Sequence, residues 1–133
     1  MHTTIKSRGP LREYSLIFEA GDEVISGLGE FAQAEALGAA AFTAIGGVHQ
    51  ADLGFYNLAT GGFNPVPFHR DQAEVLSLVG DITPQDGGYN VHGHIVLGSE
   101  NGSAHGGHLL RAITRPILIV TVEELSHPRP AHH

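Results

Sequence analysis

Three histidines in the last third of the chain have the type and spacing of metal ligands. His92 and His94 alternate in a stretch typical of a β-strand, so their side chains are expected on one face. Asn101-Gly102 is a strong hairpin signal, and a returning strand could bring His108 beside them. Three imidazoles suit zinc, nickel or copper and leave a fourth ligand position open. The spacing therefore predicts a divalent metal site.

The same three imidazoles allow a second interpretation. Histidines are often buried and satisfied by hydrogen bonds alone, in a polar core or at a contact between subunits. A His-x-His pair is a loose signal when it stands by itself. From these residues alone, a metal site and a hydrogen-bonded cluster both stay open.

Three further polar residues are candidates for a catalytic role. Glu74 and Glu123 lie in predicted strands, and each could be a general base or could orient a ligating imidazole. Facing solvent or pairing with an arginine is the alternative for both. The third candidate, His49, follows a Gly-Gly pair and is expected in a loop. His105 lies three residues before His108, so its side chain is expected on the strand face opposite to that of His108. The residues name no reaction, so whether the protein is an enzyme stays open.

The charge of the chain limits its partners. Seven basic and fourteen acidic residues give a net charge of -7 with histidines neutral, which disfavours unaided nucleic-acid binding and fits a small anionic or polar ligand at a metal better. There is no cysteine, so a metal would need nitrogen and oxygen ligands. No apolar run reaches the ~20 residues of a membrane helix, and the N-terminus lacks a signal core. We expect a cytoplasmic protein without a membrane partner.

The elements that must position the histidines are one helix and a series of short strands. Asp22 is the expected N-cap of a helix that starts near Glu23 and ends at Leu37, with Gly38 in the left-handed cap position. Strands are predicted over 11–19, 39–45, 51–59, 74–79, 90–98, 104–112 and 116–124, with 63–69 at a sheet edge because of its two prolines. This order predicts an α+β fold, a mostly antiparallel sheet with one main helix in a single compact domain. A flexible N-terminal arm (1–10) and a flexible C-terminal tail (126–133) are expected to flank a domain over 11–125.

The ordered set of motifs resembles the plants-and-prokaryotes-conserved domain, also called the PPC, PCC, PD1-like or DUF296 domain. The resemblance covers about residues 11–125. It is carried by Phe18-Glu19-Ala20-Gly21-Asp22-Glu23, Ile45-Gly46-Gly47-Val48, Ala51-Asp52-Leu53-Gly54-Phe55-Tyr56, Glu74-Val75-Leu76-Ser77-Leu78-Val79-Gly80, His92-Gly93-His94, Asn101-Gly102, Gly106-Gly107-His108-Leu109 and Thr121-Val122-Glu123.

The resemblance implies a homotrimer with a histidine cluster that some prokaryotic members use to bind a metal. It favours zinc at His92, His94 and His108, in a domain of unresolved activity that takes a small ligand or substrate. Plant members join the domain to AT-hooks, so the alternative is a DNA-associated or regulatory interaction module without catalysis. The AT-hook core is Arg-Gly-Arg-Pro, and the most similar stretch here, Ser7-Arg8-Gly9-Pro10, lacks the second arginine.

Overall fold

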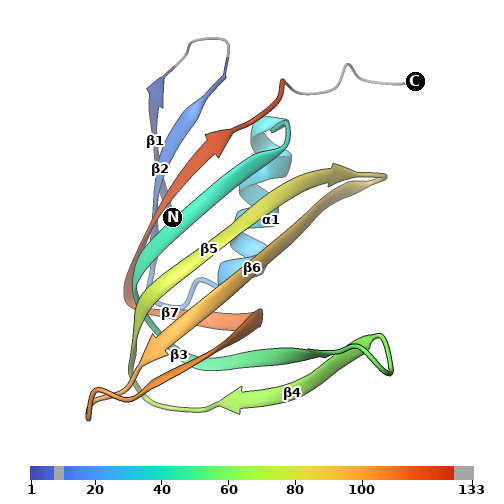
Figure 1. Ribbon diagram of the computed structural model, residues 1–133. Coiled ribbons are helices and arrows are strands. Elements are labelled where there is room, and N and C mark those ends of the chain that lie inside the picture. Colours follow the sequence, from blue (N-terminus) through green and yellow to red (C-terminus); the bar gives the residue numbers. More distant parts are fainter. Residues whose placement is uncertain (8–10, 128–133) are drawn as a thin grey trace.

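One strongly bent antiparallel sheet, with a single helix packed on one face, makes up the computed structural model, which describes residues 1–7 and 11–127 (Figure 1). The elements are β1 (His2–Ser7), β2 (Glu13–Glu19), α1 (Val24–Glu35), β3 (Ala40–Asn57), β4 (Gly62–Phe68), β5 (Ala73–Gln85), β6 (Gly88–Gly98) and β7 (Ala104–Glu124). The strand order is β1-β2-β7-β6-β5-β3-β4, and β7 also pairs with β3. The expected single domain of mostly antiparallel sheet with one helix is confirmed, although the sheet dominates. Within the described ranges, no helix has the length and hydropathy needed to cross a membrane.

Helix α1 covers the sheet with an apolar stripe. Val24, Leu28, Phe31 and Ala32 are buried, at the spacing of one helical face. The caps differ from the prediction by one or two residues. Glu23, not Asp22, is the N-cap, and its carboxylate accepts hydrogen bonds from the first-turn backbone; the left-handed residue is Ala36, with φ 48°, and not Gly38.

The two longest strands each join two stretches that the sequence divides. Residues 39–45 and 51–59 were predicted as separate strands, as were 104–112 and 116–124, but they form the continuous, bent strands β3 and β7 (Figure 1). A Cβ atom on Gly46 would collide with the carbonyl oxygen of Ile117, and one on Gly47 with that of Arg115. The glycines therefore let the two strands pass closely at their bends instead of ending a strand.

The N-terminal segment also differs from the prediction of a flexible arm. Residues 2–7 form strand β1, which pairs antiparallel with β2 and gives the sheet an additional edge. The expectation of a flexible arm overlooked that β2 offers a free row of hydrogen-bonding groups next to this segment. Most of the predicted flexible tail, residues 128–133, lies outside the described residues.

Two hairpins matter for the site, and the one at Asn101-Gly102 confirms the sequence prediction. The turn at Gly61-Gly62 joins β3 to the proline-containing edge strand β4, and Gly61 has the φ of 76° that such a turn requires. The Asn101-Gly102 turn joins β6 to β7, with Gly102 at φ 86°. These hairpins set the pairing registers that place the histidines and their neighbours.

Candidate metal centre

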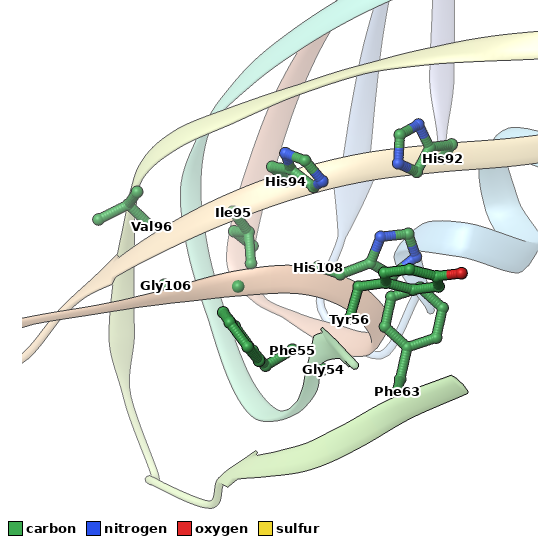
Figure 2. A pocket seen from close by; sticks show the side chains of 11 residues that line it. Gly54, Phe55, Tyr56, Phe63, His92, His94, Ile95, Val96, Gly106 and His108 are labelled. Carbon is green, nitrogen blue, oxygen red and sulfur yellow. The ribbon is translucent and has the colours of Figure 1, made fainter. Parts of the chain in front are cut away.

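The three predicted ligands meet on neighbouring strands. His94 of β6 lies directly opposite His108 of β7 in the antiparallel register, and His92 is two residues away on the same face. One ring nitrogen from each histidine lies within 4.8 Å of the others. Figure 2 shows the three side chains on β6 and β7 around one space. The structure therefore brings together the group that the sequence predicts.

The arrangement is compatible with one tetrahedrally bound cation. With metal–nitrogen distances of about 2.0–2.1 Å, ligand nitrogens in a tetrahedral site lie about 3.3 Å apart. The ring centroids are 4.9 to 5.7 Å apart, so small side-chain rotations bring the nitrogens to that spacing. His94 is exposed and the other two are half-buried, which leaves an approach for the ion. All three ligands are nitrogens, a set that suits zinc, nickel or copper.

The environment of His108 favours the neutral imidazole that a metal requires. Burial lowers the pKa of His108 below its usual value, and repulsion by His92 and then His94 lowers it further. A neutral ring can use a nitrogen lone pair for a metal without first losing a proton.

A carboxylate that the sequence analysis missed lies beside the cluster. Asp81 pairs with His92 across β5 and β6, and its Oδ2 lies 3.8 Å from Nδ1 of that histidine. The predicted strand 74–79 was expected to end at Gly80-Asp81, but β5 continues to Gln85 because Gly80 makes room for the ring of Phe42 and the backbone of His92. A carboxylate in this place can orient an imidazole toward a metal.

Asp81→Asn is expected to weaken zinc binding by about 10- to 100-fold, because a carboxylate beside Nδ1 of His92 would attract the N–H of a metal-bound imidazole more strongly than an amide does. Competition with a zinc chelator measures the change. Asp86→Asn, at the exposed turn between β5 and β6, is the matched control and should keep the parent affinity. Equal affinities in the two variants would exclude this role for Asp81.

Aromatic side chains of the β3–β4 hairpin form the other side of the site. The ring of Phe63 stacks on His108 at a centroid distance of 4.3 Å, and Tyr56 meets Phe63 edge-on at 5.4 Å. They are brought there because β3 also pairs with β7, with Gly54 opposite His108. No sequence signal pointed to these residues, since their approach depends on the bend of β3 and β7.

The remaining candidates are not part of the cluster. Glu74 is exposed on β5 opposite Gly98, and Glu123 is exposed on β7 opposite Glu13, both far along their strands from the histidines. His49 lies in β3 opposite Ile113 and not in a loop. His105 lies opposite Leu97 with its ring 5.2 Å from that of Phe68, outside the three-histidine group, as its offset from His108 predicted.

Comparisons with known proteins place these features in a family. Residues 5–126 match the model of the Plants and Prokaryotes Conserved (PCC) domain. A search of curated proteins found no match.

Several solved structures share the fold. A plant- and prokaryote-conserved protein of Pyrococcus horikoshii has a TM-score of 0.81 at 20% identity, over 99% of this chain and 97% of that one. A metal-containing protein of Archaeoglobus fulgidus has a TM-score of 0.81 at 26% identity, over 97% of this chain and 86% of that one. A Bacteroides thetaiotaomicron protein, described as a candidate DNA-binding protein, has a TM-score of 0.80 at 27% identity, over 94% of this chain and 85% of that one.

Proposed function

The chain belongs to the Plants and Prokaryotes Conserved domain family, and we propose that it is a metal-binding member that holds one divalent cation, zinc first, on His92, His94 and His108. The convergence of three imidazole nitrogens within 4.8 Å carries the proposal. The metal-containing relative from Archaeoglobus fulgidus supports it. The low pKa of His108 favours it as well, because the neutral ligand is already present near neutral pH.

The chain's own residues define what such a site could do. Three histidines would leave one ligand position open on a bound cation, and a cavity lined by the histidines and by side chains of β3, β4 and β6 lies next to them. A bound cation would supply a Lewis acid there. The site would then bind a small anionic or polar ligand, and any catalysis would take place on that ligand.

Metal analysis of protein purified without a nickel column tests the proposal. We expect about one equivalent of zinc per chain, or uptake of one equivalent when zinc is added to protein stripped by a chelator. A metal-free protein that also ignores added zinc would contradict it.

The assembly that goes with this function is a homotrimer. On the face of the sheet opposite α1, three neighbouring apolar side chains are exposed: Ile45, Ile117 and Ile119. The side chain of Ile45 is 62% exposed, and Ile45 lies opposite Ile119 in the pairing of β3 with β7. An apolar patch of this kind on a sheet face is typical of a subunit contact. Three copies packed on this face would bury it.

Light scattering should therefore give a mass of about three times 14.1 kDa. Ile45→Lys is expected to give monomers, because association would bury an unpaired ammonium group in every subunit. Leu58→Lys is the control: Leu58 is 89% exposed in the β3–β4 turn, and its variant should keep the parent mass. A parent protein that is monomeric at micromolar concentration would refute the trimer.

A DNA-associated or regulatory module is the second candidate, favoured by the description of the Bacteroides thetaiotaomicron relative as a candidate DNA-binding protein. The net charge of -7 argues against it, because phosphate contacts need clustered cations. We expect no binding of duplex DNA in dilute buffer. Binding that weakens steeply with added salt would support this candidate instead.

A further inference from the structure

A cavity of about 490 Å³ lies next to the three histidines, between the β3–β4 hairpin and the paired ends of β6 and β7 (Figure 2). This volume is within the range of small-molecule sites. Part of its wall consists of three aromatic side chains: Phe55, Tyr56 and Phe63. The composition of this wall gives information about the ligand that the metal site alone does not.

The three rings are more exposed than large apolar side chains usually are. Phe55 is 69% exposed, Tyr56 48% and Phe63 42%. A flat ring packed against these side chains gains burial of apolar area and a stacking or edge-on contact. Phe63 already stacks on His108, so a second planar group next to it would continue this arrangement. The wall therefore suits a flat, apolar ligand body.

The charges around the cavity restrict the other end of the ligand. Among the described residues, no lysine, arginine, aspartate or glutamate lines it. Three neutral imidazoles do not cancel the charge of a divalent cation, so the open ligand position favours one anionic group. A nucleotide or another polyanion would need cationic side chains that this cavity lacks, and the chain's net charge of -7 would repel it.

Two glycines of β7, Gly106 and Gly107, line the cavity just before His108. A Cβ atom at Gly107 would lie 3.0 Å from the carbonyl oxygen of Gly54, and one at Gly106 would lie 3.0 Å from that of Ile95. Both positions line the cavity, where β7 runs between β3 and β6. A Cβ atom at either position would crowd a backbone carbonyl, so the close approach of these strands favours glycine.

From these features we infer that the site takes a small monoanion with an aromatic body, whose anionic oxygen faces the metal and whose ring packs against the aromatic part of the cavity wall. An aromatic carboxylate is the simplest member of this class. The inference depends on the proposed metal site but makes a separate claim, namely which ligands that site prefers.

Two hydroxamates with the same metal-binding group test the preference. Zinc-loaded protein, with its zinc content measured first, is titrated with benzohydroxamate and with acetohydroxamate by calorimetry. We expect benzohydroxamate to bind about tenfold more tightly or better. Cyclohexanecarbohydroxamate, which is apolar but not flat, should bind more weakly than the benzoyl compound.

Variants connect the preference to the wall. Phe55→Ala and Tyr56→Ala should each reduce the benzohydroxamate to acetohydroxamate affinity ratio about threefold to tenfold. Leu58→Ala, in the same hairpin but not lining the cavity, should leave the ratio unchanged.

The inference and the metal proposal fail in different ways. A full zinc content with equal affinities for the two hydroxamates, or with equal affinities for the benzoyl and cyclohexyl compounds, would overturn the aromatic preference and leave the metal site standing. Failure to bind zinc at all, seen before any titration, would overturn both.

Discussion

Zinc content should fall from about one equivalent per chain to near zero in His94→Ala, while the protein keeps its fold. His94 lies between the other two candidate ligands in the pairing register, opposite His108 and two residues from His92. Removing one of three protein ligands leaves a two-histidine site, which binds a divalent cation too weakly to retain it through purification. The loss of metal is measured by elemental analysis, and the fold by circular dichroism.

Because His94 is exposed, the substitution should remove metal binding without lowering the stability of the fold. An exposed side chain that makes no buried contact costs little stability when truncated, typically within about 0.5 kcal/mol. The matched control is His105→Ala, which removes an imidazole from the same hairpin but outside the three-histidine group. This control should keep its zinc. A His94→Ala protein with its full metal complement would show that the ligand assignment is wrong.

The convergence of the three histidines could be predicted because it depends on local rules. Alternation along one strand puts His92 and His94 on one face, and the Asn101-Gly102 turn fixes the register that places His108 beside them. Neither rule needs knowledge of the rest of the fold. The helix and the edge position of β4 followed in the same way from spacing and from proline.

The surroundings of the ligands could not be predicted, because they depend on contacts between distant segments. Gly46 and Gly47 have the sequence signature of a turn, yet they bend β3 across β7 and bring Phe63 onto His108. Asp81 was expected just beyond the end of a strand and instead lies within it, beside His92. Only the pairing of β3 with both β5 and β7 decides these positions.

Glu123 and Glu124 also show which features follow from local sequence and which depend on distant contacts. Glu123 was chosen as a candidate because it lies in a strand, but it is exposed, whereas its neighbour Glu124 is 4% exposed. Alternation along the strand predicts that one of the two is buried, without saying which. The partner that makes burial of Glu124 tolerable, Arg12, is 112 residues away in the sequence and could not be inferred from it.

Loss of this buried carboxylate should destabilise the protein strongly. Glu124 accepts four hydrogen bonds, from Arg12 Nε, Nη2 and backbone N–H and from the backbone N–H of Gly38. It thereby connects the ends of β2, α1 and β7. Glu124→Ala leaves the guanidinium and two backbone donors without their acceptor, and we expect a loss of about 3 kcal/mol in the free energy of unfolding, measured by urea denaturation. Glu123→Ala, one residue earlier and exposed, should cost less than about 0.5 kcal/mol.

The pH dependence of unfolding tests the charge of Glu124 separately from its packing. Hydrogen bonding to Arg12 outweighs burial and lowers the pKa of Glu124 from 4.5 to about 2 in the folded protein. Because the folded pKa lies below the unfolded one, this group's contribution to stability is complete above about pH 5 and is lost as pH falls toward 2. The parent protein should therefore lose more stability between pH 6 and pH 3 than Glu124→Gln, which has no charge to lose.

The control is Glu123→Gln. Since it removes an exposed carboxylate, its stability should follow the same pH dependence as that of the parent. If stability fell equally with pH in the parent and in Glu124→Gln, the charge of Glu124 would contribute nothing to stability beyond the packing and hydrogen bonds that glutamine keeps.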